Sequence, residues 1–393
     1  MKFAVFCALF AVATCASLGP SSMGGDIERI VQKYGYKINK YEVQTEDGYI
    51  LNFHRLYQGA DGSSNEQTDK SEREVVLLFH GYLFDSEEFV MGGKTEALAF
   101  YLIEQGFEVY LANARGTVYG MRHAHLNPKS DSAFWRYCFH DIGAKDLPAV
   151  IDKVLEISGR SKLHFIGHME GSAASYVLLS EKPEYNDKIE NLISLGPMAY
   201  LQNSKHELIN KAINYDRVTF NKNFGMSTFN PSELVMKDVR DRCVSEKYER
   251  KVCDNAYFLM NGYNSVNYNE TTVDEILPRV PIQAASKALL HWVQIKKSGR
   301  FEKFDENFSG KTQGLRQVEE YDLSKITVPV AFLYAPNDYL SSVDDINTLK
   351  GKFTKVYGDY MFEEFSNNMD LILAKDVERV NQKVVEFLKV NSV

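Results

Sequence analysis

The chain has 393 residues, of which 44% are hydrophobic and 25% charged. This composition is ordinary for a globular protein and excludes wholesale disorder, and the length allows two or three domains. The net charge of −8 argues against a nucleic-acid partner.

The N-terminal segment has the pattern of a secretory signal. Met1 and Lys2 precede an apolar run over residues 3–13, and small residues around Ala16 offer a cleavage site. We therefore expect residues 1–16 to be a signal peptide and the remaining protein to be secreted. Since no later segment reaches about 18 consecutive apolar residues, we expect no integral membrane segment.

The following elements alternate between strands and helices. Residues 26–34 have helical spacing, 41–51 predict a hairpin that turns at Asp47-Gly48, and 58–73 predict a polar surface loop. Apolar runs then predict strands at 75–79, 108–112, 163–166 and 192–195, between helices at 96–105, 145–157 and 172–180. This order predicts an α/β fold with a mostly parallel sheet covered by helices on both faces.

The alternation stops over residues 201–304, which show no clear strand pattern and are rich in Asn, Phe, Tyr and Met. It resumes with a predicted strand at 328–334 and ends with a predicted helix at 375–388. The middle stretch therefore interrupts the α/β alternation.

One turn carries the strongest functional signal. The predicted strand at 163–166 runs through a Gly-x-x-x-Gly turn, from Gly167 to Gly171, into a predicted helix. This is the context of a nucleophile elbow, in which glycines permit a strained turn that presents one side chain to an active site. That side chain is Met169, whose thioether has no proton to lose and cannot attack a carbonyl carbon.

Several segments resemble successive landmarks of the acid lipase family, which includes lysosomal acid, gastric and insect neutral lipases. They lie at 77–82, 111–116, 122–128, 134–135, 140–143 and 146–152. The resemblance implies an α/β-hydrolase fold with an inserted cap, and members of the family cleave triacylglycerols or steryl esters. On this basis residues 17–200 and 305–393 form the hydrolase core, and residues 201–304 form the cap.

The catalytic triad that this family requires is incomplete. A serine hydrolase of this fold has Ser, Asp and His in that chain order, and Asp338 follows the predicted strand as the acid should. The resemblance places the histidine where Asn368 stands, and an amide cannot act as a general base. All nine histidines lie at or before His291, so the chain has none after Asp338.

The oxyanion hole is expected to persist in part. The resemblance assigns its donors to the backbone N–H groups of Tyr82 and Glu170. The family usually has Gln at the second position, so Glu170 places a carboxyl group where negative charge would develop.

No other residues supply the missing chemistry in the sequence. Ser172 and Ser175 lie in the helix after the elbow, His168 matches a structural position of the family, and His123 and His125 are expected to pack or cap. The chain contains no His-Glu-x-x-His, Cys-x-x-Cys or phosphate-binding glycine motif, so we expect no metal and no cofactor.

Five cysteines are present. Cys7 and Cys15 would leave with the signal peptide, and in an oxidising compartment Cys243 and Cys253 are the natural pair, with Cys138 left as a buried thiol. The alternative is that all three remaining cysteines are reduced.

Three functions stay open. The first is a secreted, catalytically inactive lipase-like protein of lipid metabolism or transport that binds an apolar lipid or ester. The second is a yolk or storage protein derived from a lipase, which 23 tyrosines and 24 phenylalanines would suit. The third is an active ester hydrolase. Sequons at Asn269 and Asn307 are expected to carry glycans on a secreted surface.

Overall fold

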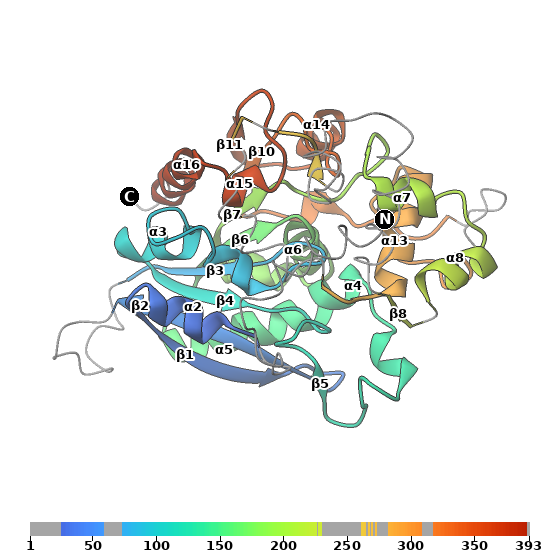
Figure 1. Ribbon diagram of the computed structural model, residues 1–393, viewed down its shortest axis with the longest axis horizontal. Coiled ribbons are helices and arrows are strands. Elements are labelled where there is room, and N and C mark those ends of the chain that lie inside the picture. The colour runs from blue at the N-terminus through green and yellow to red at the C-terminus, as the bar shows by residue number, and fades with distance from the viewer. Residues whose placement is uncertain are drawn as a thin grey trace, which may run out of the picture.

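The computed structural model describes residues 25–58, 73–225, 227–229, 261–264, 266–267, 269, 272, 282–308 and 317–390. Its centre is one sheet with strand order β1-β2-β4-β3-β6-β7-β10-β11, and β5 pairs with β2 (Figure 1). The strands are β1 (Tyr36–Gln44), β2 (Tyr49–Gln58), β3 (Val75–Phe79), β4 (Glu108–Ala112), β5 (Arg122–His123), β6 (Leu163–His168), β7 (Ile189–Leu195), β10 (Val330–Tyr334) and β11 (Val356–Met361).

Helices cover both faces of this sheet. The α-helices are α2 (Ile27–Lys33), α3 (Leu98–Glu104), α4 (Phe139–Asp141), α5 (Leu147–Ser158), α6 (Glu170–Glu181), α7 (Glu207–Ala212), α8 (Arg217–Phe224), α13 (Ser286–Ser298), α14 (Val343–Lys350), α15 (Asp370–Leu373) and α16 (Val377–Lys389). Helices α3 and α6 connect neighbouring parallel strands in opposite directions along the sheet, so right-handed crossovers place them on opposite faces. Helix α16 packs against α3, and α5 packs against α6.

The strand pairing confirms the predicted fold class. Strands β4, β3, β6, β7, β10 and β11 are parallel, whereas β1 and β2 form the predicted antiparallel hairpin. That hairpin turns at Asp47-Gly48, and Gly48 has the positive φ of 97° that the turn requires. Strand β11 was not predicted, because it is an edge strand in which exposed and polar residues hide the apolar pattern.

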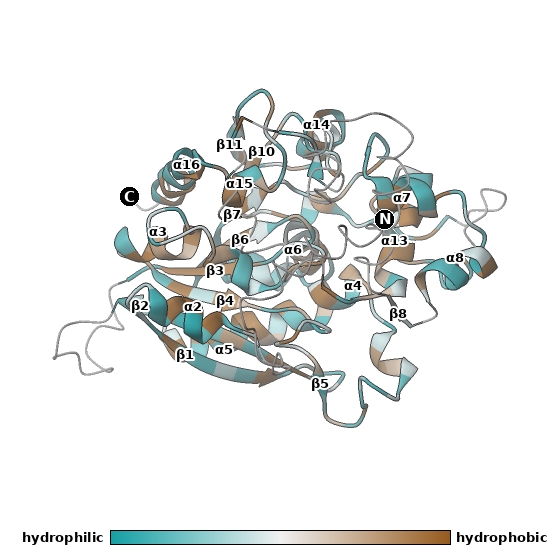
Figure 2. Ribbon diagram, in the orientation of Figure 1, coloured by the Kyte–Doolittle hydropathy of each residue, from teal (hydrophilic) through white to brown (hydrophobic). Residues whose placement is uncertain are grey.

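The core lies between the sheet and its helices. Every residue of β3, β4, β6 and β10 is buried, so these strands read as apolar runs rather than as an alternating pattern. Figure 2 shows β3, β4 and β10 largely in the colour of hydrophobic residues, whereas α16 alternates between hydrophilic and hydrophobic residues. This rigid core fixes the loops at the carboxyl ends of the strands.

The chain between β7 and β10 contributes α7, α8 and α13, which gather at one end of the molecule, on the right in Figure 1. It also contributes the short strands β8 (Thr228–Phe229) and β9 (Ala284–Ala285), which pair antiparallel. Sequence patterns predicted no strand here, because two residues are too few to show alternation. The boundaries of the cap at 201 and 304 stay a prediction. Within the ranges described above, no helix is long and apolar enough to cross a membrane.

Candidate functional site

The turn between β6 and α6 has the strained geometry of a nucleophile elbow. Met169 has φ 46° and ψ −110°, a conformation that costs a non-glycine residue about 1–3 kcal/mol. The flanking glycines allow the close packing: a Cβ on Gly167 would come within 2.6 Å of the Ser172 nitrogen, and one on Gly171 within 2.4 Å of the Phe79 oxygen. The turn therefore has the geometry of an elbow, with Met169 at its apex.

Met169 is fixed at this apex by backbone and side-chain contacts. Its N–H donates to the Leu195 oxygen at 2.9 Å, and its own oxygen accepts from Met198 N–H at 3.3 Å. The side chain is only 4% exposed, and its Sδ would lie 2.9 Å from a Cβ built on Gly81. The thioether therefore fills the space in which a nucleophilic hydroxyl would stand.

Asp338 and Asn368 lie beside this apex, at the carboxyl end of β7. A Cβ on Gly196, the residue after Leu195, would be 3.3 Å from the Asn368 Cβ and 3.8 Å from the Asp338 Oδ2. The fold thus places Asp338 and Asn368 together at Gly196, next to Leu195, whose oxygen accepts the Met169 N–H.

Asp338 is buried and forms no ion pair with another described residue. Its Oδ1 accepts a hydrogen bond from Leu340 N–H at 2.7 Å, while its Oδ2 has no partner within the described part of the chain. Burial raises the pKa of Asp338 to about 8, because the charged form loses its hydration. Burial therefore favours the neutral form of this carboxyl group.

Asn368 is fully buried, and among the described residues neither its Nδ2 nor its Oδ1 has a hydrogen-bond partner. Its neighbours are well bonded: Asn367 Nδ2 donates to the Gly262 oxygen at 2.8 Å, and Asp370 Oδ2 accepts from Asn264 Nδ2 at 2.8 Å. These bonds hold the loop of Asn368 against the inserted segment, so its position is well defined.

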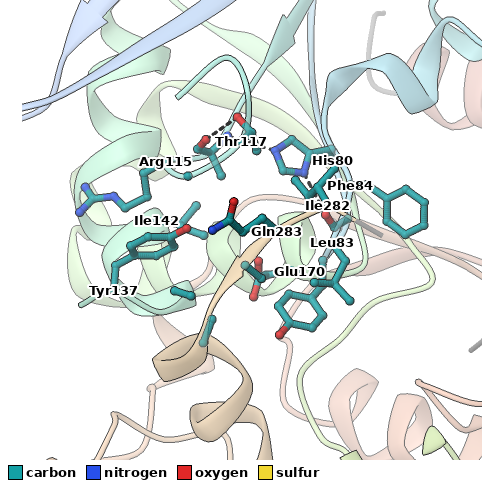
Figure 3. Close-up of a pocket in the computed structure, with 17 residues that line it drawn as sticks. His80, Leu83, Phe84, Arg115, Thr117, Tyr137, Ile142, Glu170, Ile282 and Gln283 are labelled. Atoms are coloured by element: carbon teal, nitrogen blue, oxygen red, sulfur yellow. Dashed lines mark hydrogen bonds between the residues drawn. The ribbon is translucent and has the colours of Figure 1, made fainter. Parts of the chain in front are cut away.

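The predicted oxyanion side is a small cavity of about 30 Å³, which includes Tyr82 and Glu170 (Figure 3). The Glu170 Oε1 accepts a hydrogen bond from Trp292 Nε1 at 2.9 Å, and burial raises the pKa of Glu170 to about 7. Sequence reasoning missed Trp292, because it lies in the insertion far along the chain from the elbow. The cavity is lined by His80, Gly81, Tyr82, Leu83, Phe84, Ala114, Arg115, Gly116, Thr117, Tyr137, Ile142, Glu170, Ile282, Gln283, Ala284, Ala285 and Ala288.

The hydroxyl groups near the elbow are engaged in local structure. The Ser172 Oγ donates to the Gly167 oxygen, and the Ser175 Oγ donates to the Ser172 oxygen, both at 2.7 Å. Each hydroxyl thus bonds a backbone carbonyl of its own segment and is not aimed at the apex.

The histidines considered from the sequence have structural partners too. The His168 Nδ1 bonds the Glu88 Oε1 at 3.0 Å, and the same oxygen accepts from Gly81 N–H at 3.0 Å. The His123 Nδ1 accepts from His125 N–H at 3.0 Å. Glu88, which links the elbow to the loop after β3, had no signal in the sequence.

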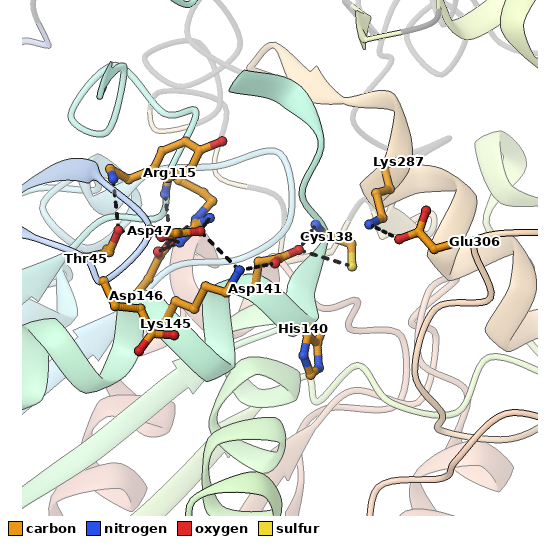
Figure 4. A network of polar contacts seen from close by, with 12 residues as sticks. Thr45, Asp47, Arg115, Cys138, His140, Asp141, Lys145, Asp146, Lys287 and Glu306 are labelled. Atoms are coloured by element: carbon orange, nitrogen blue, oxygen red, sulfur yellow. Dashed lines mark hydrogen bonds and ion pairs between the residues drawn. The ribbon is translucent and has the colours of Figure 1, made fainter. Parts of the chain in front are cut away.

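A partly buried ionic network surrounds Arg115, one of the residues that line the cavity (Figure 4). The Arg115 guanidinium donates to Asp146 through Nε at 2.8 Å and to Asp47 through Nη1 at 2.7 Å. Lys145 pairs with Asp47 at 3.2 Å and with Asp141 at 3.1 Å. The charge of Arg115 is therefore compensated within the protein. Among the described residues no three His, Cys, Asp or Glu side chains gather as a metal site would require.

The sheet order, the elbow and the acid after β10 define an α/β-hydrolase. Residues 27–93 match the family described as a partial alpha/beta-hydrolase lipase region, and residues 74–224 match the alpha/beta hydrolase fold. Lipase 1 of Drosophila melanogaster is 34% identical over 90% of this chain and 77% of its own length, and human gastric triacylglycerol lipase is 30% identical over 89% and 87%. The chain belongs to the acid lipase family.

Solved structures confirm the fold. A thermophilic esterase from Thermogutta terrifontis superposes with a TM-score of 0.51 at 13% identity, covering 89% of this chain and 98% of the esterase.

Proposed function

We propose that this lipase-like protein binds an apolar lipid or ester without cleaving it. The observation that carries the proposal is Met169 at the apex of an intact elbow, with a neutral amide, Asn368, in place of the general base. Loss of a serine-protease triad costs about 10⁶-fold in rate, while the remaining oxyanion hole and binding contribute only about 10³–10⁴ over water. The active-hydrolase alternative lacks both reacting groups.

The proposal predicts that the purified protein hydrolyses neither short-chain chromogenic esters nor triolein or cholesteryl oleate above a buffer blank. It also predicts no labelling by serine-directed fluorophosphonates, because the apex offers no hydroxyl. An active lipase of the family, assayed in parallel, is the positive control. Hydrolysis that follows the protein's own elution profile would rule out this function.

A lipid carrier and a storage protein differ in what they contain. Mass spectrometry of lipids that co-purify with the protein separates these roles. A bound lipid supports the carrier, whereas an abundant protein without lipid supports storage.

Secretion is part of the proposal and makes its own prediction. Cys243 and Cys253 lie outside the described residues, and we expect them to be joined, which stabilises the fold by roughly 2–3 kcal/mol in the chain-entropy model. Cys138 is buried and forms no disulfide with another described residue. Peptide mapping without reduction checks the pair, and two free thiols, or a bond to Cys138, would contradict it.

The same peptide map reports glycans. The Asn307 side chain is exposed, whereas the Asn269 Nδ2 donates to the Glu96 Oε2 at 3.3 Å. We therefore expect a glycan at both sequons, with the higher occupancy at Asn307.

A further inference from the structure

Glu170 is a buried acid with no countercharge among the described residues. Its one hydrogen bond to a described residue comes from Trp292, and no described cation forms an ion pair with it. Arg115 lines the same cavity, but Asp47 and Asp146 compensate its charge. A buried carboxyl group in this situation is stabilised by any ligand that donates a hydrogen bond or brings a positive charge.

The cavity beside Glu170 has the composition of a head-group site. Tyr82 and Tyr137 lie on its wall, and the charge of Glu170 contributes to the raised pKa of both, after burial itself. The Tyr82 hydroxyl is buried and has no partner among the described residues. A cavity of about 30 Å³ holds a group the size of one or two waters. Several remaining lining residues are apolar, among them Leu83 and Ile142.

Glu170 and the tyrosines of the cavity wall should discriminate between ligands with different polar head groups. An ionised Glu170 only accepts hydrogen bonds, so it repels a ligand carboxylate and binds a hydroxyl or an ammonium. The aromatic rings of the wall add attraction for an ammonium. The free Tyr82 hydroxyl can donate to a hydroxyl oxygen.

We propose that this cavity binds the head group of an apolar amphiphile that donates a hydrogen bond, a hydroxyl or an ammonium, and that it rejects a carboxylate. The inference rests on the proposed lipid-binding function and names the ligand class for the same site.

Three probes with one tail test the inference: dodecan-1-ol, dodecylamine and dodecanoate, each below its micelle concentration and at pH 8.5. Since the chain has two tryptophans and Trp292 bonds Glu170, intrinsic fluorescence reports binding. We expect the alcohol or the amine to bind at least about tenfold more tightly than dodecanoate, a difference of about 1.4 kcal/mol. Whichever of dodecan-1-ol and dodecylamine has the higher affinity identifies the preferred head group, a hydroxyl or an ammonium.

Glu170→Gln is the matched variant, and Glu156→Gln, on the exposed surface of α5, is the control. Glu170→Gln should tighten dodecanoate and weaken dodecylamine by about tenfold each, whereas Glu156→Gln should leave the order unchanged. Circular dichroism checks the fold of each variant. If Glu170→Gln does not fold, the order of the three probe affinities in the wild-type protein decides the inference.

The outcomes separate the two proposals. Dodecanoate bound as tightly as the other two probes would overturn the head-group inference and leave the lipid-binding function standing. Binding of none of the probes, together with no binding of diolein, would overturn the proposed function itself.

Discussion

The double variant Met169→Ser/Asn368→His should hydrolyse short-chain esters, while each single variant stays near the wild-type background. The elbow keeps the strained φ of 46° at position 169, so a serine there would project into the site. An imidazolium at position 368 would supply a partner to the Asp338 Oδ2, which has none among the described residues. Of the roughly 10⁶-fold contribution of an intact triad, we expect about 10²–10⁴ to return.

The single variants are the first controls, because a serine without its base is a poor nucleophile and a base without a nucleophile has no role. Adding Asp338→Asn to the double variant should abolish the gain. Adding Glu170→Gln should increase it, because the carboxyl charge beside the oxyanion position is removed. An inactive double variant with a native circular dichroism spectrum would show that the residues do not reach one another.

The second prediction concerns stability against pH. Asp338 has a pKa of about 8 in the folded protein and about 4 in the unfolded chain. The folded state therefore prefers the protonated form, and its advantage is complete below about pH 4 and is lost as the pH rises toward 8. The unfolding free energy should therefore fall steadily across this window. Glu170 and Asp370, with raised pKa values of about 7 and about 6, act in the same direction.

Asp338→Asn should remove the contribution of Asp338 to the pH dependence of the unfolding free energy. Urea unfolding at pH 5, 7 and 9 measures it, with the exposed Asp187→Asn as the matched control. We expect the wild-type and control proteins to lose stability steeply between pH 5 and 9, and Asp338→Asn to lose less. Parallel curves for wild type and Asp338→Asn would contradict the assignment of a neutral, buried acid.

The fold class could be predicted from the sequence because many residues contribute to the patterns that define it. The apolar runs of β3, β4, β6 and β10 are buried throughout, and the turn at Gly48 requires a glycine, so local patterns and tertiary structure agree. Strand β11 and the pair β8–β9 escaped prediction, since an exposed edge and a two-residue strand carry no clear periodicity.

Only part of the candidate site could be predicted from the sequence. The turn chemistry around Gly167 and Gly171 located Met169, and chain order located Asp338. The contact between Glu170 and Trp292 joins the elbow to the insertion and depends on tertiary packing, which no local pattern encodes.

The central claim is that the protein holds a lipid without cleaving it. Isotope-labelled diolein, which carries a hydroxyl and two ester bonds, tests both parts in one measurement after incubation with purified protein and gel filtration. We predict that intact labelled diolein elutes with the protein and that no labelled oleate forms above a protein-free blank. Labelled oleate that accumulates in proportion to the protein, or a protein fraction free of diolein, would contradict the claim.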